Sequence, residues 1–308
     1  MSAIKGIYPP IPTFFDENED LDLATLREHL TRLKAAGITG FVALGSNGEA
    51  VHLDRNERRA VISTTREMAG SEGQVLAGAG TDSTRGTIAL CQLASEAGAD
   101  IALVLPPHHY RSRMDAASLR AHYLAVADAS PIPVMIYNMP GNTAGLDLDA
   151  ETVITLSAHP NIAGMKDSSG NVAKLAEVVS GARADFVTLA GSAGFLLPAL
   201  VVGARGAIAA LANIAPRECL ELVSLYDAGK MDQARALQAR LVPVNTAVTS
   251  GYGVPGLKAA LEFVAHYGGA PRQPLAPLGQ GERVKLRSLL AEADLMRGMR
   301  PATLPSST

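Results

Sequence analysis

The chain has 308 residues, more than most single domains, but α/β barrels of about 200–250 residues routinely fold as one domain. Its 27 lysines and arginines face 30 aspartates and glutamates, and no block of like charges occurs, so nucleic acid is not an expected partner. The two cysteines, Cys91 and Cys219, lie inside apolar helical patterns, which indicates reduced core residues and not a disulfide framework.

Short apolar or β-branched runs alternate with longer segments of helical period along most of the chain. Strands are predicted at residues 7–14, 40–44, 75–79, 101–105, 134–137, 162–166, 186–190 and 207–209. Helices are predicted between and after them, at residues 22–36, 54–69, 84–97, 115–129, 149–158, 171–180, 193–202 and 215–228. Such strand-helix units with short links favour parallel pairing, and eight of them close as a TIM (β/α)8 barrel, here over residues 1–228.

A doubly wound sheet is the main alternative to a barrel. It predicts a glycine-rich phosphate loop after the first strand, where this chain has Asp16-Glu17-Asn18-Glu19-Asp20. After residue 228 the helical patterns no longer alternate with strands. We therefore expect residues 229–298 to form a helical extension on the outside of the barrel and residues 299–308 to form a disordered tail.

The N-terminus and the most apolar region give no sign of export or membrane insertion. Residues 1–7 have no apolar core followed by a cleavage site. Residues 193–215 are interrupted by Pro198, Arg205 and several glycines, which is typical of buried helix and strand. We expect a cytoplasmic protein without membrane contact.

The strand that ends near Lys166 carries no other charge before its end. Because side chains alternate along a strand, Gly164, Lys166 and Ser168 share one face, and Met165 and Asp167 share the other. A lysine in a dry pocket loses its proton more readily, and the free amine attacks ketones. For a lone lysine, an exposed position at a strand end would be the preferred interpretation. The uncharged strand before it, the polar segment with a glycine after it and the recurrence of similar units along the chain favour the nucleophile.

In barrels of this kind the reacting groups lie at the carboxyl ends of the strands. The second strand ends in Gly45-Ser46-Asn47-Gly48-Glu49, whose amides and side chains suit a small carboxylate, although an ordinary glycine turn explains it as well. Glu49 itself is expected to accept from loop amides, and Asp167 to hold the next helix. The fifth strand ends at Tyr137, either a proton shuttle or a core tyrosine.

His108 and His109 follow the fourth strand and invite a metal-site interpretation. Adjacent positions on a strand point to opposite faces, and no further His, Asp or Glu spacing completes a site. We treat them as loop residues and expect no metal and no organic cofactor.

Several motifs occur together in a specific order. They are Gly45-Ser46-Asn47-Gly48-Glu49 with Glu57, Tyr137-Asn138-Met139-Pro140 with Thr143, and Gly164-Met165-Lys166-Asp167-Ser168. In these motifs the chain resembles, over nearly its whole length, the dihydrodipicolinate synthase and N-acetylneuraminate lyase superfamily of pyruvate-type class I aldolases. The resemblance implies a carbon–carbon lyase that works without a cofactor.

The resemblance also implies roles for individual residues. Lys166 would form the Schiff base, Tyr137 would be the proton-relay phenol, and Ser46 would sit between Tyr137 and the substrate. Tyr110 would complete the relay from a neighbouring subunit, in a homotetramer built as a dimer of dimers. The substrate-binding residues implied in this way are Ser46, Asn47, Gly48, Asn142, Ser168, Gly191 and Ile208.

One departure bears on the substrate. The synthases place an arginine after the Tyr-Asn-x-Pro motif, where this chain has Asn142, and an amide lacks the charge-assisted contact of a guanidinium. The motifs, with Asn47 after Ser46, are most similar to those of 4-hydroxy-2-oxoglutarate aldolases. We expect reversible cleavage of a 4-hydroxy-2-oxo acid, favouring 4-hydroxy-2-oxoglutarate, to pyruvate and glyoxylate. Arg111 or Arg113 would hold a distal carboxylate or be solvated loop residues.

Three alternatives are left open. The chain could cleave 2-keto-3-deoxy sugar acids, as a related set of eukaryotic aldolases does. It could condense pyruvate with aspartate semialdehyde as a dihydrodipicolinate synthase. The least favoured alternative is a 2-oxo acid binding protein without catalysis.

Overall fold

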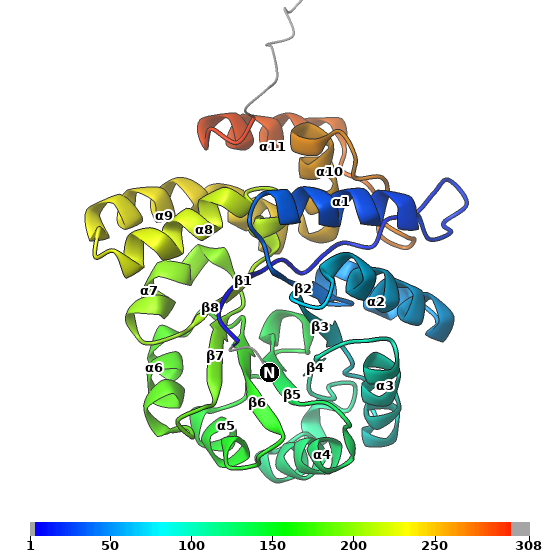
Figure 1. Ribbon diagram of the computed structural model, residues 1–308, viewed down its shortest axis with the longest axis vertical. Helices are drawn as coiled ribbons and strands as arrows, with labels where there is room; N and C mark the ends of the chain where they lie inside the picture. Colours follow the sequence, from blue (N-terminus) through cyan, green and yellow to red (C-terminus); the bar gives the residue numbers. More distant parts are fainter. Residues whose placement is uncertain (1–3, 297–308) are drawn as a thin grey trace, which may run out of the picture.

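The computed structural model describes residues 4–296, and its centre is a barrel of parallel strands (Figure 1). The strands are β1 (Gly6–Tyr8), β2 (Gly40–Ala43), β3 (Gln74–Gly78), β4 (Ile101–Val104), β5 (Val134–Asn138), β6 (Ile162–Asp167), β7 (Val187–Ala190) and β8 (Gly206–Ile208). They are hydrogen-bonded in the order β1-β8-β7-β6-β5-β4-β3-β2. The predicted TIM barrel is confirmed.

The barrel closes between β1 and β2 through very few hydrogen bonds. The Val42 amide donates to Pro9 at 3.0 Å, and the Ile11 amide donates to Val42 at 3.0 Å. The strand predicted over residues 7–14 is too long, because β1 ends at Tyr8. Pro9, Pro10 and Pro12 lack the N–H that a continuous ladder needs.

Each barrel strand except β8 is followed by a helix before the next strand. These helices are α1 (Leu23–Ala35), α2 (Arg55–Ala69), α3 (Thr84–Glu96), α4 (Ala116–Ala129), α5 (Ala150–Ser157), α6 (Val172–Gly181) and α7 (Leu196–Val201), and α8 (Pro216–Asp227) follows β8. Side-chain oxygens of the residue before the helix cap α1 to α6, as with Asp54, which forms a capping box with Glu57 on α2. The helix predicted at 193–202 is shorter, because residues 193–195 form a 3-10 turn.

Apolar side chains fill two layers. Inside the barrel, Tyr8, Leu76, Leu103 and Leu189 pack with other strand residues, so the barrel is filled and not a pore. Between the strands and the helices lies the larger core. Cys91 and Cys219 are buried free thiols, as predicted.

Three further helices follow the barrel, namely α9 (Met231–Thr246), α10 (Gly253–Ala265) and α11 (Gln280–Glu292). They gather with α1 and α8 on one side of the molecule (Figure 1). The Tyr267 hydroxyl, just beyond α10, contacts Nδ1 of His29 at 2.9 Å and accepts from Nε of Arg32 at 3.0 Å. A division into two units at residue 228 stays a prediction, and the tail predicted at 299–308 lies outside the described residues.

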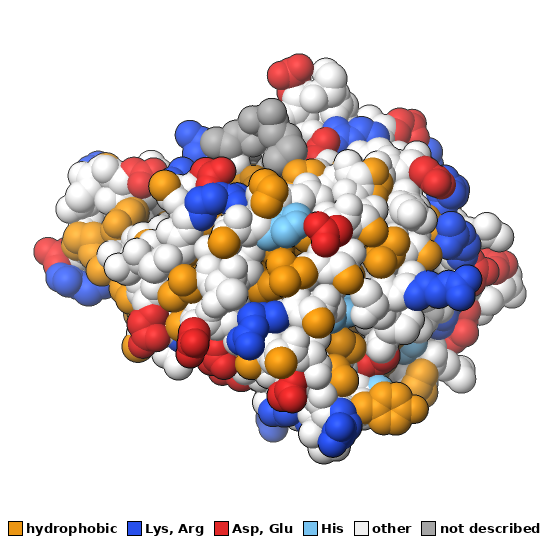
Figure 2. All heavy atoms as spheres, turned by 90° about the horizontal axis from the view of Figure 1, so that it is seen from below, with side chains coloured by type: hydrophobic (Ala, Val, Ile, Leu, Met, Phe, Trp, Pro, Cys, Tyr) orange, Lys and Arg blue, Asp and Glu red, His pale blue; other side chains and the backbone are white. Residues whose placement is uncertain are grey.

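Charges of both signs are interspersed on the face shown in Figure 2, in keeping with the net charge of −3. Between residues 4 and 296, the structure contains no helix with the length and apolarity needed to cross a membrane.

Candidate active site

Lys166 and Tyr137 face each other from neighbouring strands. They are register partners on β6 and β5, and Nζ of Lys166 lies 3.8 Å from the centroid of the Tyr137 ring. Both side chains are buried at the carboxyl ends of their strands. Gly164, on the same face of β6, has no room for a side chain, because a Cβ there would lie 2.3 Å from the Val187 carbonyl oxygen of the neighbouring strand.

The Tyr137 hydroxyl sits in a polar environment within this buried site. It lies 3.3 Å from the Ser46 hydroxyl. Burial raises the pKa of Tyr137, but the Lys166 ammonium and hydrogen bonds to Lys166, Ser46 and Ser168 lower it, and the net pKa is below its ordinary value. A phenol shifted in this direction is better able to exchange a proton with a bound substrate near neutral pH.

The loop after β2 forms a tight turn beside Tyr137. The Gly48 amide donates to the Gly45 carbonyl at 2.9 Å, and the Glu49 amide donates to the Ser46 carbonyl at 3.2 Å. Over residues 4–296, the amides of Ser46 and Asn47 have no hydrogen-bond acceptor. Two neighbouring free amides of this kind can form a small anion-binding concavity, and carboxylate binding by this loop stays a prediction.

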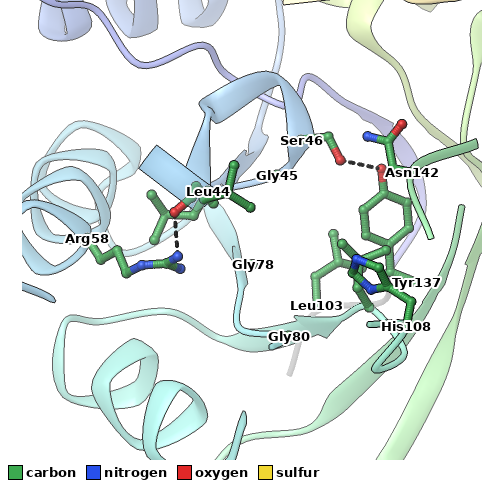
Figure 3. Close-up of a pocket in the computed structure, with 13 residues that line it drawn as sticks. Leu44, Gly45, Ser46, Arg58, Gly78, Gly80, Leu103, His108, Tyr137 and Asn142 are labelled. Atoms are coloured by element: carbon green, nitrogen blue, oxygen red, sulfur yellow. Dashed lines mark hydrogen bonds between the residues drawn. The ribbon is translucent and has the colours of Figure 1, made fainter. Parts of the chain in front are cut away.

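A cavity of about 300 Å³ opens between this loop and the ends of β3 to β5 (Figure 3). It is lined by Leu44, Gly45, Ser46, Ala50, Val51, Arg58, Gly78, Gly80, Leu103, Leu105, His108, Tyr137 and Asn142. Three of the predicted site residues, Ser46, Tyr137 and Asn142, therefore line one cavity.

Arg58 was not predicted, yet it lines this cavity from the first turn of α2. In Figure 3 it extends from the side opposite Tyr137. Its guanidinium donates to the carbonyl oxygens of Ala50 and Leu53, the latter at 3.2 Å, and burial lowers its pKa. Among the described side chains no carboxylate pairs with Arg58, so the cavity wall carries a positive charge that is not neutralised. Arg58 lies in the first turn of the helix that follows the Ser46 loop, and this position could have marked it as a candidate from the sequence.

Tyr110 does not reach this cavity within one chain. Its side chain is 70% exposed on the loop after β4, where its ring contacts only that of His109 among the aromatic side chains described. Arg111 and Arg113 form the next turn and are also exposed, outside the cavity lining.

The remaining predicted substrate-binding residues are not part of the cavity lining. Ser168 follows Lys166 on the same face, and a Cβ at Gly191 would lie 1.9 Å from the Ser168 hydroxyl oxygen, so only glycine fits there. The Gly191 amide donates to the Asp167 carbonyl at 2.6 Å. Ile208 is fully buried inside the barrel. The substrate contacts assigned to these residues stay predictions.

A polar network, buried at Asn138, Asp167 and Lys174, lies behind the site and was also not predicted. Nδ2 of Asn138 donates to Asp147 at 2.6 Å and to Asp167 at 2.7 Å, and Lys174 on α6 forms ion pairs with both carboxylates. Asp167 thus contacts the next helix, as expected. Asn138 also accepts from the Leu148 amide at 3.0 Å, so this network anchors both ends of the turn that carries Asn142.

Comparisons with known proteins agree with this geometry. A model of the dihydrodipicolinate synthetase family matches residues 3–293. The chain is 44% identical over 294 residues to a protein of Emericella nidulans named probable 4-hydroxy-2-oxoglutarate aldolase, mitochondrial, covering 94% of this chain and 95% of that one. It is 42% identical to the L-threo-3-deoxy-hexylosonate aldolase of Hypocrea jecorina, with coverages of 94% and 95%.

Solved structures of proteins named for dihydrodipicolinate synthase or its family superpose closely on this chain. Dihydrodipicolinate synthase DapA-2 from Bacillus anthracis matches with a TM-score of 0.90 at 30% identity, covering 94% of this chain and 99% of that one. YagE, a prophage protein of the dihydrodipicolinic acid synthase family from E. coli K12, was solved in complex with pyruvate and matches with a TM-score of 0.88 at 30% identity, covering 95% and 99%.

Proposed function

Because the chain belongs to the dihydrodipicolinate synthetase family, we propose that it is a class I aldolase cleaving 4-hydroxy-2-oxoglutarate reversibly to pyruvate and glyoxylate. The observation that carries this proposal is the buried pair of Lys166 and Tyr137, with Nζ 3.8 Å from the ring centroid and Ser46 at the phenol. An amine beside a proton-exchanging phenol is what Schiff-base chemistry requires.

The proposed reaction begins at C2 of the substrate. The unprotonated Lys166 amine attacks the C2 carbonyl, the Tyr137 phenol gives its proton to the departing hydroxyl group, and loss of water leaves an iminium ion beside the Tyr137 phenolate. The Tyr137 phenolate takes the proton of the C4 hydroxyl while the C3–C4 bond breaks. The electron pair of that bond passes into the iminium and forms an enamine. Glyoxylate leaves, and Tyr137 returns the proton to C3, which restores the iminium ion. Water hydrolyses this iminium to pyruvate and free lysine, and the proton released goes back to the Tyr137 phenolate.

The two ends of the substrate are both carboxylates, and the site offers a partner for each. The free amides of Ser46 and Asn47 would bind the carboxylate next to C2, with Ser168 near the reacting hydroxyl. Arg58, across the cavity from Tyr137, would hold the distal carboxylate that becomes part of glyoxylate. Arg58 replaces Arg111 and Arg113 in this role, because those two lie outside the cavity lining.

The charge on Arg58 favours this substrate over a 3-deoxy sugar acid. The aldehyde released from such a sugar acid carries hydroxyls and no carboxylate, so it would leave the guanidinium unpaired. The sugar acid nevertheless remains the second candidate, because the Hypocrea jecorina relative is named for it.

A synthase activity is less well supported. Asn142 lines the cavity where the synthases carry an arginine, and its neutral amide offers aspartate semialdehyde no charge-assisted contact. Turnover of pyruvate with aspartate semialdehyde would restore this alternative. A binding protein without catalysis would be supported if a Lys166→Ala variant bound pyruvate as well as the wild type.

We also propose a homotetramer, arranged as a dimer of dimers, in which Tyr110 of one subunit approaches the phenol of its neighbour. The exposure of Tyr110 supports this arrangement. Analytical ultracentrifugation tests it, with Tyr110→Phe as the kinetic probe. We also propose a cytoplasmic location, which the buried free thiols of Cys91 and Cys219 suit, whereas the Emericella nidulans relative is named as mitochondrial, and cell fractionation decides between them.

The test of the mechanism is reductive trapping. Wild-type protein is incubated with pyruvate and borohydride, and its intact mass is compared with that of Lys166→Arg. A stable adduct on the wild type alone supports the proposed mechanism, and glyoxylate is then the first aldehyde to test in condensation. No adduct on the wild type would refute the Schiff-base mechanism.

A further inference from the structure

The carboxylate-binding loop is tied to the C-terminal helices through a buried ion pair. Nζ of Lys258, on α10, lies 2.7 Å from Oε1 of Glu49, and each side chain is only 1% exposed. Glu49 directly follows the turn Ser46–Gly48 that presents the two free amides. The pair therefore joins the end of the chain to the loop proposed to bind the substrate carboxylate.

Glu49 holds a conformation that needs support. Its φ of 52° and ψ of 34° place it in the left-handed region, which residues other than glycine adopt rarely and at an energetic cost. This conformation separates two successive turns, at Ser46–Gly48 and Ala50–His52, and so fixes the direction of the loop. The Glu49 amide donates to the Ser46 carbonyl at 3.2 Å, which links the conformation at Glu49 to the turn that presents the two free amides.

Both oxygens of the Glu49 carboxylate contact residues that follow the barrel in the sequence. Oε1 pairs with Lys258, and Oε2 accepts from the Arg272 amide at 2.9 Å and contacts Nδ1 of His52 at 3.3 Å. Lys258 in turn donates to the Ala270 carbonyl at 2.9 Å. A buried carboxylate with this many partners has little freedom to move, and losing one partner would leave a buried charge unpaired.

Arg272 anchors the far end of the segment that runs from Glu49 to Glu57. Its guanidinium pairs with Glu57 at 2.7 Å, the residue that forms the capping box of α2, and donates to the His52 carbonyl at 2.8 Å. Lys258 and Arg272 both lie over the Phe15 ring, at 4.6 Å and 4.3 Å from its centroid. The segment from Glu49 to Glu57 is thus anchored at both ends by residues after position 257.

We infer that Lys258 is a positioning residue, which acts through Glu49 to hold the Ser46 and Asn47 amides in the orientation that binds the substrate carboxylate. The inference rests on the proposed function for the identity of the ligand. It assigns the C-terminal helices a part in substrate binding, although none of their side chains lines the cavity. A purely structural role for Lys258 would instead affect stability and leave ligand affinity unchanged.

The test compares Lys258→Met with a matched control. Tyr267→Phe also breaks contacts between the C-terminal segment and the barrel, at His29 and Arg32, but touches no residue of the loop. Borohydride trapping is run over a range of pyruvate concentrations. For Lys258→Met we expect the half-saturating concentration to rise about tenfold, equivalent to one charge-assisted contact, with the same adduct at saturation, while Tyr267→Phe stays within twofold of the wild type.

Hydrogen exchange supplies a readout that does not depend on catalysis. The amides of Gly48, Glu49 and His52 donate within the loop, so their exchange reports on its order. We expect faster exchange over residues 46–53 in Lys258→Met and no change there in Tyr267→Phe. If Lys258→Met folds poorly, Glu49→Gln/Lys258→Met carries the same test, because it leaves no unpaired buried charge.

The outcomes separate this inference from the proposed function. Unchanged exchange over residues 46–53, or an equal rise in half-saturation for Tyr267→Phe, would overturn the positioning role. Absence of any adduct on the wild type would instead remove the proposed function, and the exchange comparison would then decide alone whether Lys258 positions the loop.

Discussion

Tyr137 and Lys166 occupy paired positions on adjacent parallel strands, with the lysine Nζ 3.8 Å from the centroid of the phenol ring. Parallel pairing of β5 and β6 brings the two side chains to the same end of the barrel. In the proposed mechanism the two residues have separate roles: Lys166 forms the covalent bond to the substrate, and Tyr137 carries the proton.

Replacing Tyr137 by phenylalanine should separate these two tasks. We expect kcat for cleavage of 4-hydroxy-2-oxoglutarate to fall by about 10²–10⁴-fold, because general acid–base catalysis is lost. The imine with pyruvate should still be trapped by borohydride, because Lys166 remains. Steady-state kinetics and intact mass check the two parts, and a variant that retains full kcat would exclude Tyr137 as the proton carrier.

The lowered pKa of Tyr137 predicts a distinctive titration. The chain has seven tyrosines and no tryptophan, so phenolate absorbance is readily followed. One phenol should ionise below the ordinary tyrosine pKa of about 10, and this step should be missing in Tyr137→Phe. Lys166→Met should move the step to higher pH, because the ammonium that stabilises the phenolate is gone.

The sign of the accompanying stability change follows from the same shift. Because the pKa is lower in the folded protein, ionisation of Tyr137 favours the folded state. This stabilisation is fully present above the unfolded pKa of about 10 and is lost as the pH falls through the folded value. Denaturant unfolding of wild type and Tyr137→Phe across that range should show the difference, and equal pH slopes would contradict it.

Much of the fold was predictable because its signals are local. Alternating periods of two and about 3.6 residues, with capping residues such as Asp54 before the helices, located the strands and helices. The error at residues 7–14 arose where three prolines replaced ladder donors, which an apolar pattern does not reveal. Ser46 and Tyr137 were both predicted at carboxyl ends of barrel strands, and their hydroxyls lie 3.3 Å apart.

The other residues of the site depend on packing between distant segments. Lys258 interrupts the apolar run Leu257–Leu261, which is a local hint of a buried cation, but nothing near it in the sequence identifies Glu49 as its partner. Arg58 reads as one charge among several at the start of an amphipathic helix. Only the barrel geometry shows that its guanidinium reaches the cavity.

His29 should make stability sensitive to acid. Burial lowers its pKa to about 3, although a hydrogen bond with Asn213 opposes the shift. As the pH falls, the histidine of the unfolded chain, with a pKa near 6.5, binds a proton before the folded one does. The contribution of His29 to the free energy of unfolding is therefore complete above pH 6.5 and decreases below it. Between pH 7 and pH 5 the wild type should lose about 2 kcal/mol more than His29→Gln in urea unfolding. Equal losses would show that His29 does not titrate on unfolding.

Arg58 should decide which 4-hydroxy-2-oxo acid is cleaved. We expect Arg58→Met to lower kcat/KM for 4-hydroxy-2-oxoglutarate by about 10–100-fold, because a charge-assisted contact to the distal carboxylate is lost. A substrate of similar length with an uncharged distal end, 4-hydroxy-2-oxopentanoate, makes no such contact and should be cleaved by both proteins with similar kcat/KM. The variant should therefore lose its preference for the dicarboxylate and keep its activity.

The control for this prediction addresses the second role of Arg58. The guanidinium also donates to the carbonyls of Ala50 and Leu53, so its loss could loosen the loop instead of a substrate contact. Loosening would raise the pyruvate concentration needed for half-maximal imine trapping, whereas loss of a distal contact would not, because pyruvate has no distal carboxylate. If trapping weakens and both substrates lose kcat/KM equally, Arg58 supports the loop and does not select the substrate.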